Sequence, residues 1–155
     1  MVDGERLVDL KKELDFTEQY VQLRNRHRDL LITNPVNAAE TREWLKREDI
    51  EIRGIVRGHL LVGVVILFLN RRGEIAIFAG SKGAGIGRKL LAIIEKIARE
   101  RGLREVWAWV LSDNVIAQRT FLNSAYRQEE NADKEHRGKT MPGFVFKKIL
   151  AHVDR

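Results

Sequence analysis

A cluster of glycines separates a β-rich segment from a long amphipathic helix, and this cluster constrains the fold more than any other feature of the sequence. Four glycines, at 80, 83, 85 and 87, lie in the stretch AGSKGAGIGRKLL at 79–91. Glycine lacks the Cβ atom that keeps a ligand away from the backbone. A helix amino terminus offers unpaired N–H groups and partial positive charge, which suit a phosphate or pyrophosphate. A tight strand-to-helix turn without a ligand is the alternative interpretation.

The elements before this turn follow from the period of the apolar residues. After a short strand near 6–10, the capping-box pair Asp15 and Glu18 predicts a helix that ends at about His27. Asn37 and Glu40 repeat the pair and predict a second short helix that reaches residue 45. Alternation over 50–56, an apolar run at 60–69 and a β-rich segment at 74–79, with turn signals between them, predict an antiparallel meander.

The elements after the turn complete an α+β order. Apolar residues at 86, 90, 94, 97 and 98 share one face of a helix that stops near Gly102. The stretch 106–111 is apolar on both faces, which predicts a central strand. A helix over 115–124 and strands near 126–131 and 143–150 follow, with a polar, mobile segment expected between these strands. We expect one domain over residues 1–155.

Two common phosphate-binding motifs do not fit the glycine spacing. The Walker pattern requires Lys after its second glycine, but Ile86 follows Gly85. The dinucleotide pattern G-x-G-x-x-G fails because Gly83, Gly85 and Gly87 are evenly spaced by two, and a meander supplies no βαβ unit.

A third pattern fits. Residues 82–87, KGAGIG, followed by Asn114 and Ala117 in the Asn-x-x-Ala arrangement, resemble the GCN5-related N-acetyltransferase (GNAT) superfamily. The acetyl-CoA motif of that family is Gln/Arg-x-x-Gly-x-Gly/Ala between a strand and a long helix, and here Lys82 stands at its first position. The order of elements from 5 to 150 also matches. The resemblance implies an α+β GNAT fold with a central mixed, mostly antiparallel sheet of six to seven strands flanked by four helices.

The resemblance also implies acetyl-CoA as co-substrate and no metal. The pyrophosphate would be held at the glycine turn, and the pantetheine arm would pair with the backbone of Phe78 and Ala79. The Phe78 amide, at an expected strand bulge, would donate to the thioester oxygen. Asn114 matches a cofactor-contacting position, and Phe121 would pack against the pantetheine sulfur. The residues expected at the turn are Lys82, Gly83, Ala84, Gly85, Ile86, Gly87 and Arg88.

The reaction implied is direct attack of a neutral amine on the thioester, with both substrates bound. The chain has no cysteine, so no cysteine nucleophile exists. Glu74 is the candidate base, and a solvated residue after a turn is its alternative interpretation. Phe121 stands where many family members carry a proton-donating Tyr, and Tyr126 is expected in the core, as are Trp107 and Trp109. The four histidines lack metal-ligand spacing.

The acceptor amine is less constrained. Leu-Arg-Asn at 23–25 with Trp44 resembles a branch that acetylates nucleotide-linked amino sugars, which makes Arg24, Asn25 and Trp44 candidate substrate-binding residues. A helix with a solvated basic face explains the same arginines. Protein amino termini and small amines stay open as acceptors. A non-catalytic acyl-CoA-binding module is an alternative of a different class, favoured by Phe121.

The net charge of +6 is unevenly distributed. Residues 1–73 carry 13 basic and 12 acidic side chains, and residues 74–155 carry 15 and 10. The excess therefore lies with the glycine turn, where Lys82, Arg88 and Lys89 are expected to face the phosphates of CoA. Charges are interleaved, which argues against a nucleic-acid partner. The longest apolar run is about half a membrane span. We expect a cytoplasmic protein that takes a small-molecule amine and has no membrane partner, with a homodimer open.

Overall fold

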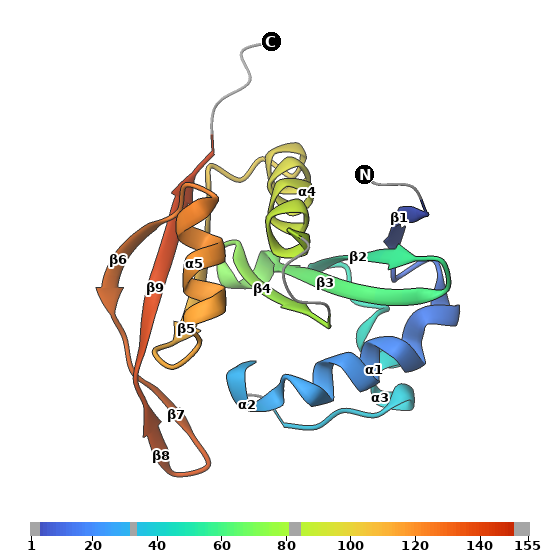
Figure 1. Ribbon diagram of the computed structural model, residues 1–155, viewed down its shortest axis with the longest axis horizontal. Helices are drawn as coiled ribbons and strands as arrows, with labels where there is room; N and C mark the ends of the chain where they lie inside the picture. Colours follow the sequence, from blue (N-terminus) through green and yellow to red (C-terminus); the bar gives the residue numbers. More distant parts are fainter. Residues whose placement is uncertain (1–3, 32–33, 81–84, 151–155) are drawn as a thin grey trace.

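The computed structural model of the protein describes residues 4–31, 34–80 and 85–150. Over these residues a seven-stranded mixed sheet has the order β1-β2-β3-β4-β5-β9-β6 (Figure 1). The antiparallel meander is confirmed as β2 (Ile50–Arg57), β3 (Leu60–Phe68) and β4 (Glu74–Ala79), with β1 (Glu5–Asp9) at the edge. The predicted central strand is β5 (Glu105–Leu111), which lies between β4 and β9 (Gly143–Ile149), and β6 (Arg127–Asn131) closes the sheet. The predicted α+β architecture is confirmed.

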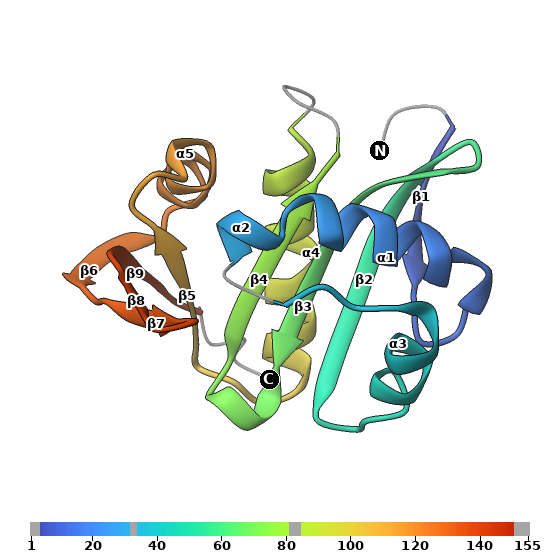
Figure 2. The same ribbon diagram turned by 90° about the horizontal axis from the view of Figure 1, so that it is seen from below.

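Helices lie on both faces of this sheet. The long helix α4 (Ile86–Glu100) lies on one face, with α5 (Val115–Asn123) beside it. On the other face, Figure 2 shows α1 (Thr17–Arg26) and α2 (Arg28–Leu31) in front of the strands, with α3 (Ala38–Trp44) next to α1. Two short 3-10 turns, η1 (Leu14–Phe16) and η2 (Leu69–Arg71), complete the described helical elements. None of the helices in these ranges has the length and apolar content needed to cross a bilayer.

Each helical layer has its own apolar core. Leu90, Leu91 and Ile94 of α4 have no exposed surface and pack on a cluster that includes Val106 and Phe146 from the far half of the sheet. Burying one such side chain stabilises the fold by about 1.5–3 kcal/mol. The apolar residues repeated along one face of α4 therefore hold the helix to the sheet. The second cluster lies under α1 and α3, and the strands that contribute to it are β1–β4. The α4 core therefore joins the two halves of the sheet.

The two expected capping boxes have different outcomes. At α3 the prediction is confirmed, because the Asn37 side-chain oxygen accepts the Glu40 N–H at 2.8 Å. At α1 it is wrong: the helix begins at Thr17, with Phe16 at the cap position and no side-chain cap bond. The 3-10 turn η1 precedes it and buries Phe16 in the second core, and this burial sets where the helix begins.

The segment expected to be a mobile connection is a β-hairpin. Strands β7 (Lys134–His136) and β8 (Lys139–Met141) pair antiparallel in a separate two-stranded sheet. Arg137 (φ 51°) and Gly138 (φ 77°) form the two-residue turn, and positive φ at both positions matches the twist of a tight hairpin. The hairpin brings Lys134 to the pocket between β4 and β5 that is described below.

β4 and β5 part almost as soon as they meet. Their ladder consists of one parallel pair, Glu74 with Trp107, whereas β4 pairs with β3 over its whole length. From that pair onward the edges of β4 and β5 diverge and leave main-chain groups of β4 without a neighbouring strand in the described part of the chain. The opening between the strands is the pocket that carries the site.

Candidate active site

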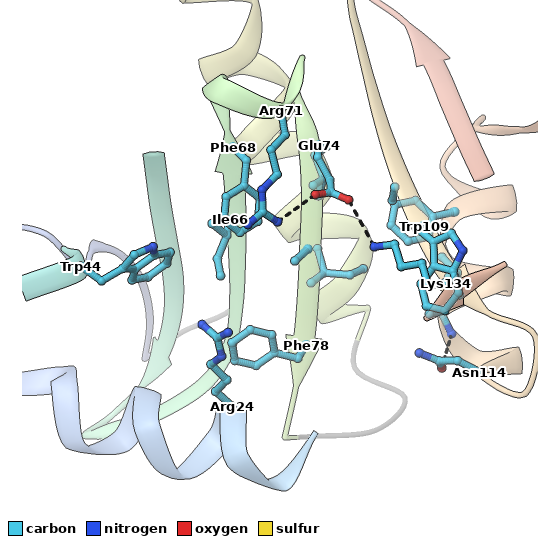
Figure 3. A pocket seen from close by; sticks show the side chains of 17 residues that line it. Arg24, Trp44, Ile66, Phe68, Arg71, Glu74, Phe78, Trp109, Asn114 and Lys134 are labelled. Atoms are coloured by element: carbon cyan, nitrogen blue, oxygen red, sulfur yellow. Dashed lines mark hydrogen bonds and ion pairs between the residues drawn. The ribbon is translucent and has the colours of Figure 1, made fainter. Parts of the chain in front are cut away.

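The pocket lies between β4 and β5 and draws side chains from both faces of the molecule (Figure 3). Strand β4 contributes five consecutive residues, Glu74 to Phe78, and β5 contributes the facing wall. The remaining lining comes from α1, α3, β3, η2, α5 and the hairpin strand β7. Its lining side chains are Arg24, Trp44, Ile66, Phe68, Arg71, Glu74, Ile75, Ala76, Ile77, Phe78, Ala108, Trp109, Val110, Asn114, Ala117, Phe121 and Lys134.

The direction of each β4 amide follows from two hydrogen bonds at the ends of the strand. The Trp107 N–H donates to the Gly73 carbonyl at 3.2 Å, and the Gly80 N–H donates to the Val62 carbonyl at 2.8 Å. Successive residues of a strand direct their main-chain groups to opposite sides. Odd-numbered β4 residues therefore direct their main-chain groups toward β5, so those of Ile77 face the pocket and those of Ala79, just beyond its lining, point to the same side.

The position of Phe78 corrects one sequence-based expectation. Its register with Val64 belongs to an unshifted ladder from the start of β4 to its end, so the expected bulge is absent from these pairs. The Phe78 amide accordingly faces β3, and the adjacent odd-numbered residues take the direction expected of it. The Phe78 side chain is 4% exposed and packs near the rings of Tyr20 and His27, at centroid distances of 5.9 and 6.0 Å. Phe78 thus forms a wall of the pocket.

The described part of the glycine turn begins at Gly85. Gly85 has φ +67°, in the left-handed region that favours glycine, and precedes the first turn of α4. Ile86 is buried and Arg88 is exposed. A Cβ atom at Gly87 would lie 2.7 Å from the Thr120 methyl group, so this glycine permits close packing of α4 and α5. The predicted residues Lys82, Gly83 and Ala84 lie outside the described residues.

Lys89, expected to face the phosphates, is engaged elsewhere. Its Nζ atom lies 3.0 Å from Oε2 of Glu5, whose other oxygen binds Arg57 at 2.8 Å. The hydrogen bond from Lys89 lowers the pKa of Glu5 below its usual value, and Arg57 acts in the same direction. Lys89 therefore ties α4 to the edge strand β1.

Glu74 lies in the pocket rather than in solvent, which excludes its alternative interpretation. The residue is 7% exposed. Its Oε1 atom accepts a hydrogen bond from Arg71 Nη1 at 3.1 Å, and its Oε2 atom lies 3.7 Å from Lys134 Nζ, as the dashed lines of Figure 3 mark. The candidate base thus lies between two cationic side chains.

Each of these cations also lies over an aromatic ring. The Arg71 guanidinium is 4.3 Å from the centre of the Phe68 ring, and Lys134 Nζ is 4.8 Å from that of Trp109. Contacts of this kind contribute about 0.5–1 kcal/mol at exposed sites and fix where the charge lies. The aromatic rings and Glu74 together hold both cations at one end of the pocket.

The three predicted acceptor-binding residues are not brought together. Arg24 and Trp44 both line the pocket, with the guanidinium 5.9 Å from the indole ring. Arg24 Nη1 donates to the Tyr20 hydroxyl at 3.0 Å, while its buried Nε has no hydrogen-bond partner in the described ranges. Asn25 does not line the pocket: its side chain makes two hydrogen bonds of 2.9 Å with the backbone of Val36.

Helix α5 supplies the opposite wall. The Asn114 side-chain oxygen accepts the Ala117 N–H at 3.2 Å and caps the helix, which gives the Asn-x-x-Ala spacing a structural reason. Phe121 is 2% exposed and stacks on Phe146 with ring centres 5.7 Å apart. Tyr126 is buried, as expected. Both predicted cofactor-contacting residues of this region, Asn114 and Phe121, line the pocket.

Sequence reasoning missed Arg71, Lys134 and the role of the tryptophans. Trp107 and Trp109 are half-buried instead of core residues, and their indole N–H groups donate to backbone carbonyls of Arg71 and Ala132. The only local signal for Lys134 was Gly138, which permits the hairpin turn. In the described ranges, His, Asp and Glu side chains form no group of three that could hold a metal ion.

Solved structures share this fold over nearly their whole length. The protein yncA from Salmonella typhimurium, with its cofactor acetyl-CoA, has a TM-score of 0.83 at 13% identity and covers 99% of this chain and 98% of its own. A ribosomal-protein-alanine N-acetyltransferase from Brucella melitensis has a TM-score of 0.80 at 19% identity, covering 94% and 99%. A spermidine N-acetyltransferase from Vibrio cholerae, with CoA and spermine, has 0.78 at 14%, covering 96% and 97%.

These identities are low, and they establish a common fold. No curated protein sequence is similar enough to this chain to count as a relative. The sequence itself matches the model of the acetyltransferase (GNAT) family over residues 13–124, a range that contains η1, the meander, the glycine turn, α4, β5 and α5. The chain belongs to the acetyltransferase (GNAT) family.

Proposed function

We propose that this GNAT-family acetyltransferase moves an acetyl group from acetyl-CoA to a primary amine by direct attack, with both substrates bound together. One observation carries the proposal. The parting of β4 from β5 leaves the main-chain groups of Ile77 facing a pocket lined by apolar and charged side chains, and a buried carboxylate, Glu74, lies where the two strands meet.

The residues present fit acetyl-CoA. An extended pantetheine arm needs main-chain partners along one strand edge, and Ala79 and Ile77 offer them. A pyrophosphate needs unpaired amides and a close approach, and the first turn of α4 at Ile86, Gly87 and Arg88 offers both. When bound, acetyl-CoA supplies the activated acetyl thioester.

The chain's own groups then have separate roles. The Ile77 amide donates to the thioester oxygen, where negative charge develops, and a preorganised donor of this kind contributes about 3–4 kcal/mol to an acyl-transfer barrier. Glu74 accepts a proton from the acceptor ammonium, directly or through water, so that the amine nitrogen can bond to the acetyl carbon as the carbon–sulfur bond breaks. Phe121 has no proton to give, so water or another group protonates the leaving sulfur, or it departs as the thiolate.

The acceptor that we propose is a nucleotide-linked amino sugar. Arg24 and Trp44, which carried this prediction from the sequence, both line the pocket, and a guanidinium suits a diphosphate. The Asn25 side chain is hydrogen-bonded to the backbone of Val36. We therefore propose that Asn25 contributes to the acceptor site by holding Val36 in position. A protein amino terminus or another small amine would enter the same pocket.

The test combines a panel of amines with one substitution. Acetyl-CoA is supplied with each amine, and free thiol is measured over time. Glu74→Gln is expected to lower turnover about 10²- to 10⁴-fold and to leave the affinity for CoA unchanged. Glu129→Gln, an exposed residue of β6, is the matched control. Thermal unfolding of each variant shows that the fold is intact.

Two results would contradict the proposal. If Glu74→Gln turns over within threefold of the parent protein, Glu74 is not the base. If CoA binds but no amine on the panel releases thiol, the protein is an acyl-CoA-binding module without transferase activity.

A further inference from the structure

Positive charge exceeds negative charge among the side chains that line the pocket. Arg24 from α1, Arg71 from η2 and Lys134 from β7 all line it, and Glu74 is its only carboxylate in the described residues. These elements lie far apart in the sequence, so the cluster is a product of the fold. Arg71 and Lys134 together exceed the single carboxylate Glu74 by one positive charge, and Arg24 adds another near Phe78 (Figure 3).

The phosphates of CoA do not account for Arg71 and Lys134. These two side chains meet at Glu74, the first residue of β4, whereas the glycine turn follows the last residue of the same strand. Five residue steps of a strand span about 17 Å. A pyrophosphate at the amino terminus of α4 therefore lies beyond hydrogen-bonding reach of either side chain.

The two cations keep donors that Glu74 does not use. Arg71 donates one N–H to Glu74, and its side chain is 56% exposed. Lys134 is 44% exposed, and its 3.7 Å separation from Glu74 is an ion pair too long for a hydrogen bond. The side chain of Glu74 is only 10% exposed. An incoming ligand therefore meets the cations before it meets the carboxylate.

We infer that the acceptor is an amine that also carries an oxyanion, a carboxylate or a phosphate, which binds between Arg71 and Lys134. The inference rests on the proposed acetyl transfer and specifies its substrate class. On binding, the oxyanion takes over the free donors of both cations, and the acceptor ammonium takes their place at Glu74. The charges of the site and of the acceptor are then paired on both sides, and the amine is delivered to its base.

Other acceptor classes fit the charges less well. A polyamine such as spermidine would bring further positive charge to a site that already has an excess of it, and like charges in such a site repel. A neutral amine without an anion could reach Glu74 only by displacing Arg71 and Lys134, and it would leave both without a new partner. An oxyanion on the acceptor solves both problems.

The experiment uses acceptor pairs that differ only in the anion. An α-amino acid is compared with its methyl ester, and an amino sugar phosphate with the unphosphorylated amino sugar, with spermidine as the polycation. We expect the anionic member of at least one pair to have a kcat/KM at least tenfold higher, which corresponds to about 1.4 kcal/mol. The pair that shows the preference identifies the oxyanion as carboxylate or phosphate.

Substitutions assign the preference to the cluster. Lys134→Met and Arg71→Met are each expected to reduce the ratio within the preferred pair at least fivefold, and Lys134→Arg to retain most of it. The matched control is Lys139→Met, which removes one exposed charge from the same hairpin without touching the pocket lining. Raising the salt concentration should increase KM for the anionic acceptor more than for its neutral counterpart.

The inference fails if neutral acceptors or spermidine are used as well as anionic ones, or if Lys134→Met and Arg71→Met leave the ratio unchanged. That failure is distinct from failure of the proposed function, in which no amine releases thiol. Calorimetric titration of each acceptor pair onto the CoA-bound protein measures the same preference without turnover. Equal affinities within every pair there would overturn the inference as well.

Discussion

Replacing Gly87 by alanine tests how α4 and α5 are held together beside the glycine turn. The new Cβ would lie 2.7 Å from the Thr120 methyl carbon, while ordinary contact begins at 3.4 Å. The Thr120 side chain or one of the two helices must therefore shift by about 0.7 Å, and overpacking of this kind costs about 1–3 kcal/mol. Alanine returns up to about 1 kcal/mol of helix propensity. The expected net loss of stability is about 0–2 kcal/mol.

A second substitution isolates the contact. Thr120→Ser removes the methyl group but keeps the hydroxyl, which donates to the Ile116 carbonyl at 3.0 Å. The nearest remaining Thr120 atoms would then lie 3.5 and 3.7 Å from the new Cβ, which is ordinary contact. In this background Gly87→Ala should be neutral or stabilise the protein by up to about 1 kcal/mol.

Equilibrium unfolding in urea of the four proteins closes this double-mutant cycle, and we expect a coupling of about 1–3 kcal/mol. The affinity for CoA should fall in Gly87→Ala and recover in the double variant, because the altered contact lies in the first turn of α4, where the pyrophosphate is proposed to bind. Equal effects of Gly87→Ala in both backgrounds would refute the packing argument.

Three further predictions concern other contacts. Lys148→Met leaves the buried Glu95 carboxylate without the cation 2.9 Å away and should cost about 3 kcal/mol in urea unfolding, whereas an unchanged midpoint would mean that the pair is solvated. Because Lys89 holds the pKa of Glu5 below 4.5, the stabilisation is complete above that pH and is lost as pH falls through the lower value in the folded protein. Glu5→Gln should therefore remove part of the acid-limb slope of stability, measured by thermal unfolding from pH 2 to 6, and an unchanged slope would contradict the assignment. Asn114→Asp keeps the cap oxygen but loses the amide donor, so it should retain stability and weaken CoA binding by calorimetry if that donor contacts the cofactor.

Elements with strong local signals were predictable from the sequence. The apolar spacing along α4 and the alternation of β2 each arise from neighbouring residues, and the structure places these two elements within a residue or two of the expected bounds. Asn114 and Phe121 were also predictable, since they follow at fixed spacing from a recognised motif. Features of this kind can be predicted without knowledge of tertiary contacts.

Tertiary contacts decided the rest. Lys134 lies in a short, polar stretch whose composition is typical of a solvated loop, and it reaches the pocket only because the hairpin folds back beside β5. The direction of the Phe78 amide depends on strand register, which a shift of one residue reverses and which composition does not reveal. Asn25 is a similar case, because its partner Val36 lies eleven positions away across a helix and a loop.

The parting of β4 and β5 has a geometric consequence for the chemistry. The Glu74–Trp107 pair is the vertex of a wedge, and the two strands are its arms. Any spreading of the arms displaces atoms in proportion to their distance from the vertex, so on β4 Ala79 is displaced most and Glu74 least. The proposed CoA-binding groups thus lie at the wide end of the opening, and the proposed base lies at its narrow end. The wide end of the wedge has room for a long molecule, while its narrow end holds the proposed base beside Arg71 and Lys134.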